Sequence, residues 1–167
     1  MRQQNRGFTL IELMITVSIA AVLATLAVPS MTSFLTSMRL SSASSLLYGD
    51  LNLARAEAIK RNTRVLMCPS SNGTSCATGT NWAVGWILCV DANSDGACDV
   101  ITTTTDPNYP NPFGVRPVLT SNLTLTSTLN TITFKPDGSA VDATLTLTAS
   151  SRTKTVSIAK AGFISRT

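Results

Sequence analysis

The sequence contains no histidine, the side chain that most often serves as a general base near neutral pH. A serine nucleophile would have to find its base elsewhere. Chemistry that depends on an imidazole is therefore excluded, and we predict that the chain is not an enzyme and needs no cofactor.

Charge is also scarce, because charged residues make up only 13% of the chain. The formal net charge of +4 includes Arg2 and Arg6, and without them 11 basic residues face 9 acidic ones, which leaves +2. Such a small excess does not by itself predict nucleic-acid binding. Hydrophobic residues reach 44% and gather in the first forty or so positions, so the remainder has the composition of a soluble domain.

Cysteine is present four times, but no Cys-x-x-Cys pair occurs. Separations of eight residues (Cys68 to Cys76) and nine (Cys89 to Cys98) fit a zinc site poorly and favour disulfides. Three pairings are possible. The most local one, Cys68 with Cys76 and Cys89 with Cys98, would close two short loops.

The N-terminal region has an unusual acid. Glu12 is the only charged residue from Phe8 to Met38, and the apolar core at residues 13–28 approaches the roughly 20 residues of a membrane helix. A cleavable signal peptide, with a cleavage site near Ala27, does not need an acid there. A plain anchor would carry Glu12 at a cost of up to about 2–3 kcal/mol at the bilayer centre. The basic residues that precede the segment predict a cytoplasmic N-terminus and an exported remainder.

The stretch RGFTLIELM, followed by an apolar helix with Pro29 near its end, resembles the N-terminus of type IV pilins and type II secretion pseudopilins. The resemblance implies that a prepilin peptidase cuts after Gly7 and that Phe8 becomes N-methylated. It further implies that Glu12 neutralises the N-terminal amine of a neighbouring subunit during filament assembly. A carboxylate in hydrocarbon is tolerated when it meets an opposite charge, which agrees with that role.

The resemblance implies a leader (1–7) and a membrane and filament-core half of a helix (8–29). The sequence pattern adds an amphipathic half (30–62) and a head (63–167). Pro29 should loosen the helix between its halves. In the second half Leu47, Leu51, Ala54 and Ala58 recur with helical period and predict one buried stripe. Asn62 suits the end of the helix.

The head shows short runs with β-type alternation that are separated by turn signals. We predict an antiparallel sheet with one face on the helix. Trp82 and Trp86 share a strand face and are expected in the core. The expected strands are residues 63–68, 82–90, 97–103 (a hairpin partner of the preceding one), 114–120, 123–127, 131–135, 144–149 and 153–159, and residues 106–112 are expected to form a loop.

The order of these elements resembles the minor pilins of the GspH/FimT type, in which FimU-like proteins are included. The resemblance implies an α+β pilin fold, with a long N-terminal helix packed on an antiparallel head. It also implies a minor pilin that primes assembly or caps the tip of a type IV pilus. The alternatives are an H-type minor pseudopilin of type II secretion and a DNA-binding subunit. Implied partners are other minor and major pilins, the prepilin peptidase and the inner-membrane assembly platform. The chain would reside in the inner membrane, with its head in the periplasm, and then at the pilus tip.

Two further groups could bind ligands. In DANSDG, residues Asp91, Asn93 and Asp95, with Asp99, could supply oxygens to calcium, but the bidentate glutamate is missing and a hairpin loop is the favoured interpretation. Some FimT relatives bind DNA through C-terminal arginines. Here Phe163 stands where an arginine would be expected, so DNA contacts would fall to Lys154, Lys160 and Arg166, and a solvated basic surface is the favoured interpretation.

Overall fold

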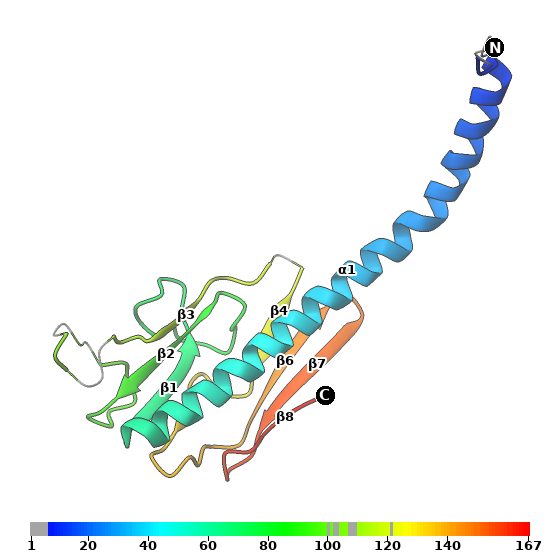
Figure 1. The fold of residues 1–167 in the computed structure, drawn as a ribbon. Coiled ribbons are helices and arrows are strands. Elements are labelled where there is room, and N and C mark those ends of the chain that lie inside the picture. Colours follow the sequence, from blue (N-terminus) through cyan, green and yellow to red (C-terminus); the bar gives the residue numbers. More distant parts are fainter. Residues whose placement is uncertain (1–6, 100, 102–103, 107–109, 121) are drawn as a thin grey trace, which may run out of the picture. The chain divides into compact units, whose positions relative to one another are not determined.

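The computed structural model describes residues 7–99, 101, 104–106, 110–120 and 122–167, and only the backbone of residues 26–30. Over these residues one long helix, α1 (Leu10–Arg61), is followed by eight strands (Figure 1). The chain divides into two compact units, of which the first ends at Met38 and the second begins at Arg39. One helix followed by antiparallel strands confirms the predicted α+β class.

The first unit consists of the early turns of α1 and the short segment before them. The described side chains from Phe8 to Thr25 are all exposed. The hydroxyl groups of Thr16, Ser18 and Thr25 donate to carbonyl oxygens three or four residues earlier, at 2.7 to 2.9 Å. These polar side chains are therefore satisfied within the helix, which suits a helix in an apolar medium.

The remaining turns of α1 belong to the second unit and carry the predicted stripe. Leu47, Leu51, Ala54 and Ala58 are all fully buried, which confirms it. The helix ends where Asn62 adopts a positive φ of 52°. The amides of Asn62 and Thr63 donate to the carbonyls of Ile59 and Ala58, at 3.3 and 3.2 Å, which is a Schellman end.

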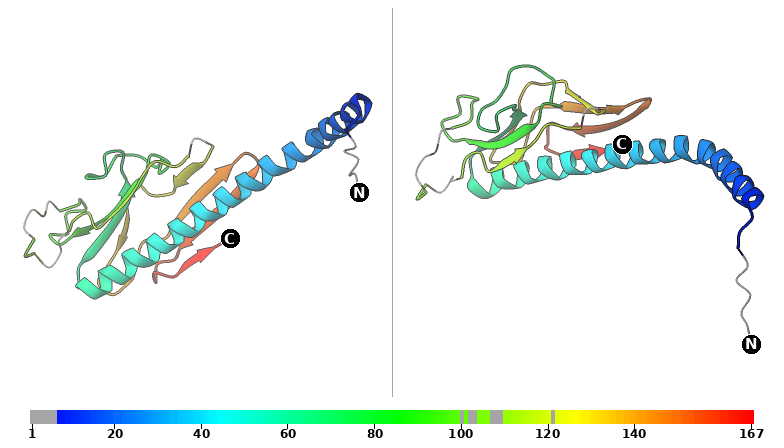
Figure 2. Two further views of the ribbon diagram at one scale, coloured as in Figure 1. Left: turned by 45° about the horizontal axis from the view of Figure 1, so that its top comes forward. Right: turned by 90° about the horizontal axis from the view of Figure 1, so that it is seen from above.

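The strands form two four-stranded antiparallel sheets, in the orders β3-β2-β1-β5 and β4-β6-β7-β8. Figure 2 shows both sheets on one side of the later turns of α1. The head is thus a helix layer on a sheet layer. The bounds are β1 (Arg64–Pro69), β2 (Trp86–Asp91), β3 (Gly114–Arg116), β4 (Thr124–Ser127), β5 (Ile132–Phe134), β6 (Ala143–Ala149), β7 (Arg152–Ile158) and β8 (Ile164–Arg166).

The main core lies between α1 and both sheets. Trp82, Trp86 and Phe134 are fully buried there, so the predicted core position of the two tryptophans is confirmed. β1 and β2 are buried on both faces. Val65 and Met67 face the main core, whereas Leu66 and Cys68 join a second, smaller cluster with Ile87 and Cys89.

Two details of the predicted sheet were wrong, and one strand was not predicted. The strand expected at residues 82–90 begins only at Trp86, because Gly85 turns the chain with a φ of 105°. The neighbours of β2 are β1 and β3, not a strand at residues 97–103, of which 100, 102 and 103 lie outside the described residues. The short last strand, β8, had no alternating pattern long enough to predict it.

The Asn111 side chain covers this end of β2 together with one backbone amide of the expected hairpin partner, that of Asp99, which donates to the Val90 carbonyl at 3.1 Å. The Asn111 amide accepts a hydrogen bond from the Val90 N–H at 2.8 Å and donates to the Val90 carbonyl at 3.1 Å. It also donates to the Asp99 carbonyl at 2.8 Å. The backbone of Val90 is thereby satisfied beyond the end of the short β3, as a strand would satisfy it.

Candidate assembly site

The predicted processing site lies ahead of the helix. Gly7 and Phe8 are exposed and precede Leu10, where α1 begins. The space around the Gly7 Cα is open, and the Phe8 side chain is 80% exposed. Both residues are therefore open on the described side of the predicted cleavage point, and the cleavage itself stays a prediction.

Glu12 caps the start of α1. The amide and hydroxyl groups of Thr9 donate to Glu12 Oε2, at 3.2 and 3.1 Å, and the Glu12 amide donates to Thr9 Oγ1 at 3.3 Å. This reciprocal arrangement is a capping box. Glu12 therefore has hydrogen-bond partners within its own subunit. No cation of the described residues forms an ion pair with it.

The surface around Glu12 is apolar. Phe8, Leu10, Ile11 and Leu13 are between 58% and 80% exposed. The same character continues along the helix, and from residue 7 to 38 Glu12 is the only charged side chain. We call residues 8–25 the apolar segment.

Pro29 lies within α1, which continues through it. Its side chain is outside the described residues, so the predicted loosening of the helix remains a prediction. Where the structure is described, no helix combines the length and hydropathy of a membrane crossing. The division of the helix at residue 29 and the leader at 1–7 likewise stay predictions.

In the second unit, a buried acid joins the helix to the first sheet. Asp50 on α1 is 3% exposed. Its carboxylate accepts two hydrogen bonds from Arg116 of β3, at 2.7 and 2.9 Å, and one from the Trp86 indole at 2.9 Å. The hydrogen bond to Asp50 raises the pKa of Arg116 above its usual value, against the opposing effect of burial.

The sequence did not lead us to predict this cluster. Asp50 follows Leu47 by three residues and precedes Ala54 by four, so it lies on the stripe. An acid on a buried helix face needs a charged or hydrogen-bonding partner, so the position of Asp50 on the stripe was the sequence signal for this cluster.

The C-terminal segment also attaches to α1. Arg55 donates from Nε to the Gly138 carbonyl at 3.0 Å, and its guanidinium carbon lies 5.6 Å from the centre of the Phe163 ring. Arg166 donates to the Ser45 hydroxyl at 2.6 Å and lies 5.7 Å from the Tyr48 ring centre. Arg166, one of the three residues considered for DNA binding, thus contacts the helix. Lys154 lies in β7 and Lys160 is exposed after it.

The DANSDG loop is held by its own hydrogen bonds. The fully buried Asp91 accepts from the amides of Asp95 and Gly96 at 3.0 and 3.1 Å, and Asp99 accepts from the Ala92 amide at 2.6 Å. Asn93 accepts from the Asp95 amide at 3.0 Å. Among the described residues the one cluster with metal-ligand proximity is made of cysteines, so these acids do not converge on a shared point.

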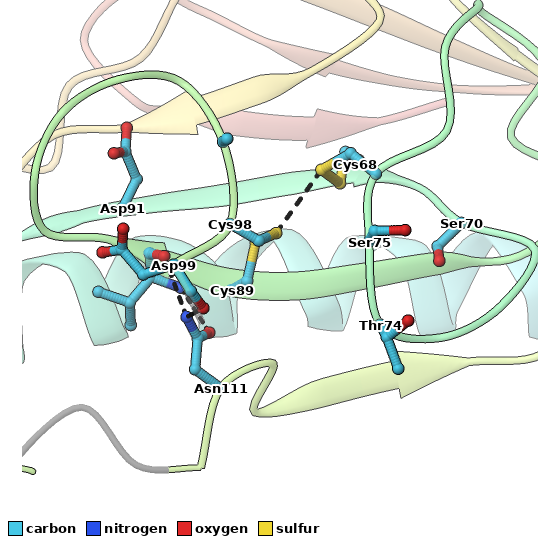
Figure 3. The surroundings of a disulfide bond; sticks show 12 residues. Cys68, Ser70, Thr74, Ser75, Cys89, Asp91, Cys98, Asp99 and Asn111 are labelled. Carbon is cyan, nitrogen blue, oxygen red and sulfur yellow. Dashed lines mark hydrogen bonds between the residues drawn. A yellow bond between two sulfur atoms is a disulfide. The ribbon is translucent and has the colours of Figure 1, made fainter. Parts of the chain in front are cut away.

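The four cysteines form two adjacent disulfides. Cys68 is bonded to Cys76 and Cys89 to Cys98, which is the most local of the three pairings. Figure 3 shows the two bridges facing each other, and the Sγ atoms of Cys76 and Cys98 are 3.6 Å apart. The bridges therefore make one sulfur cluster, which sequence spacing alone could not show.

Comparison with protein families gives two matches. Residues 43–162 match the family described as type II transport protein GspH. Residues 2–28 match the prokaryotic N-terminal methylation motif, which contains Gly7, Phe8 and Glu12. None of the curated proteins compared matches the chain.

Solved structures give the same fold. The type IV minor pilin FimU of Pseudomonas aeruginosa aligns with a TM-score of 0.56 at 18% identity, over 79% of this chain and 90% of FimU. The minor pseudopilin EpsH of the type 2 secretion system of Vibrio cholerae aligns with a TM-score of 0.54 at 12% identity, over 77% of this chain and 96% of EpsH.

Proposed function

Because the chain belongs to the family described as type II transport protein GspH, we propose that it is a minor pilin that helps to prime or cap a type IV pilus. The resemblance predicted from the sequence is confirmed at the level of family and fold. The family consists of structural pilin and pseudopilin subunits, so the chain is not an enzyme. Its prepilin-type N-terminus is that of a membrane-anchored protein.

The observation that carries the proposal is the exposed apolar segment with its single acid. Side chains such as Leu10 and Ile19 are 77% and 56% exposed, and each large apolar side chain gains about 1.5–3 kcal/mol on full burial. Such a surface needs an apolar medium. We propose the inner membrane before assembly and the neighbouring helices of a filament afterwards.

Glu12 supplies the selectivity of that assembly. Cleavage after Gly7 would give Phe8 a free amine, which Glu12 of an adjacent subunit could bind. Thr9 lies beyond the cleavage point, so the capping box survives processing. The carboxylate then exchanges part of its hydrogen bonding to Thr9 for an ion pair with the amine, which is stronger in a low-dielectric medium.

The head would present its surfaces to other pilins. The Asp50 cluster, together with Arg55 and Arg166, attaches the helix to both sheets and to the C-terminal strand. A head so attached keeps its orientation about the later turns of α1. Its proposed partners in the filament are other minor and major pilins. The proteins proposed to process and assemble it are the prepilin peptidase and the inner-membrane assembly platform.

The sharpest test is Glu12→Gln. Glutamine also serves at the third position of a capping box, so this variant keeps the helix start and loses only the charge. We expect cleavage after Gly7 and membrane insertion as in the wild type, with at least tenfold less chain in sheared filament fractions. The matched control is Glu57→Gln on the same helix, which should assemble normally. Equal incorporation of the Glu12→Gln chain would refute the proposed charge pairing.

The processing step is tested separately by mass spectrometry of the mature chain. We expect an N-terminal N-methylated Phe8, and a Gly7→Val chain should remain uncleaved in the membrane. An intact residue 1–7 segment in the wild-type chain would contradict the processing.

A deletion in the host separates the pilus from the alternative, a minor pseudopilin of type II secretion. For a type IV pilus subunit, surface pili and twitching should decrease while exoprotein secretion continues. The reverse pattern would assign the chain to secretion.

A further inference from the structure

The fold gathers into one sulfur cluster four cysteines whose sequence spacing alone fits a zinc site poorly, and in this structure they are bonded as two disulfides. The Sγ atoms of Cys68, Cys76, Cys89 and Cys98 all lie within 4.8 Å of one another. A tetrahedral zinc thiolate with Zn–S bonds near 2.3 Å requires sulfur separations of about 3.8 Å. The Cys76 and Cys98 sulfurs, at 3.6 Å, already have this separation without a bond between them.

The four sulfurs come from two strands and two loops. Cys68 and Cys89 lie on the antiparallel strands β1 and β2, where Cys68 is opposite Ile87 and Cys89 is opposite Leu66. They are therefore diagonal neighbours on one sheet face. Cys76 and Cys98 reach the same point from the loops that follow these strands, and both are partly buried.

The loop around Cys76 is shaped by hydrogen bonds that do not involve sulfur. The Asn72 side chain accepts from the amides of Thr74 and Ser75, both at 3.0 Å, and the Ala77 amide donates to the Pro69 carbonyl at 2.7 Å. These bonds flank Cys76 on both sides. They would hold it near Cys68 even if the disulfide were reduced.

The loop around Cys98 is organised in the same way. The Asp99 amide donates to the Val90 carbonyl at 3.1 Å, and the Asp99 carboxylate accepts from the Ala92 amide. The Asn111 side chain donates to the Asp99 carbonyl. The position of Cys98 is thus fixed through its neighbour (Figure 3).

We propose that the four cysteines, when reduced, bind one Zn²⁺ ion in a tetrahedral thiolate site, so that the same two loops are closed either by two disulfides or by one metal ion. Each disulfide is reduced to two thiols either by a dithiol, which gives two electrons and two protons and becomes a disulfide, or by a phosphine, which gives two electrons and becomes the phosphine oxide while water supplies the oxygen and the two protons. Four thiols then bind Zn²⁺ and release four protons, and zinc keeps its oxidation state. An oxidant of the disulfide class reverses the sequence and releases the ion.

The experiment uses the full chain in detergent micelles, reduced anaerobically with a phosphine and titrated with Co²⁺ as a spectroscopic probe. We expect sulfur-to-cobalt charge transfer and tetrahedral ligand-field bands that saturate at one equivalent, and their loss on addition of one equivalent of Zn²⁺. The oxidised chain should show neither band. Absence of the tetrahedral bands in the reduced chain would overturn the proposal.

Variants test whether all four sulfurs are ligands. Cys76→Ser, at a partly buried position, should lower Zn²⁺ affinity at least tenfold and weaken the charge-transfer band. Thr74→Ala, a substitution in the same loop at an exposed side chain, should change neither. Equal affinity of the two variants would refute the four-sulfur site.

Two further measurements do not depend on the variants. Zn²⁺ should raise the melting temperature of the reduced chain and slow the return of its disulfides in the presence of an oxidant, because bound thiolates are protected. The affinity should fall at least tenfold in denaturing urea. An unchanged affinity in urea, or no change in melting, would show that the fold builds no site.

Discussion

Asp50 and Arg116, 66 residues apart in the sequence, form a two-bonded ion pair at 2.7 and 2.9 Å that joins α1 to β3. The Asp50 side chain is 4% exposed and that of Arg116 is 33% exposed. Removal of one partner from a buried pair leaves an uncompensated charge, which costs more than the pair itself contributes. The Trp86 indole alone would then stabilise the carboxylate.

We therefore predict that Arg116→Met lowers the free energy of unfolding by about 3 kcal/mol, the low end for buried pairs because Arg116 is partly exposed. Urea unfolding monitored by tryptophan fluorescence measures it. Lys160→Met, at an exposed basic residue of the head, is the control and should change little. In the double variant Asp50→Leu/Arg116→Met, part of the stability should return, and a larger loss than in the single variant would contradict this account.

Ser44 offers a stabilising change. Its side chain is on the buried face of α1, and its Oγ has no hydrogen-bond partner in the described part of the chain. Because an unsatisfied buried hydroxyl costs about 1–3 kcal/mol, Ser44→Ala should raise the free energy of unfolding by at least 1 kcal/mol. Ser42→Ala, exposed on the same helix, gains only helix propensity, near 0.5 kcal/mol. Equal thermal shifts for the two variants would show that Ser44 carries no such penalty.

Glu57 should make stability fall in acid. The hydrogen bond from Arg61, supported by one from Lys60 and opposed by burial, holds the pKa of Glu57 below its ordinary 4.5. Because the pKa of Glu57 is lower in the folded than in the unfolded chain, its contribution to the free energy of unfolding is fully present above pH 4.5. That contribution is lost as the pH falls through the pKa of the folded state. The urea midpoints of the wild type and of Glu57→Gln should therefore differ at pH 7 and become equal at pH 3. The difference at pH 7 should be roughly 0.5 kcal/mol.

Gly85 occupies a position that a side chain cannot share. Its φ is 105°, and an added Cβ would lie 2.5 Å from the Arg116 carbonyl oxygen. Gly79 has a φ of 110° but open space around it. Gly79→Ala therefore measures the backbone cost alone, and Gly85→Ala should be more destabilising by about 1–3 kcal/mol, the cost of overpacking. Thermal unfolding of both variants makes the comparison, and equal losses would show that the close approach is unimportant.

The sequence predicted the helix and most strands because their signals are local. The buried residues from Leu47 to Ala58 recur with the period of an α-helix. Asn62 marks the end of α1 because it adopts a left-handed backbone conformation. The alternation in β6 and β7 was equally readable. Such patterns depend only on neighbours along the chain.

The contacts that organise the site were beyond local pattern. Asn111 sits in a segment rich in turn residues, and no sequence signal shows that its amide would satisfy Val90, 21 residues earlier. The proximity of the two disulfides likewise follows from the diagonal placement of Cys68 and Cys89, which depends on the register of β1 against β2. The capping of α1 by Thr9 could have been predicted from the sequence, because Thr-x-x-Glu at the start of a helix is a local signal.

The amide of Asn111 also has a consequence for crowded assemblies. An open strand edge is a template onto which another chain can add itself, and close-packed heads would bring such edges together. Since Asn111 occupies both hydrogen-bonding groups of Val90, this stretch of β2 offers no template. A partner head that meets this end of β2 finds no free backbone group of Val90 to pair with, and must bind there through side chains.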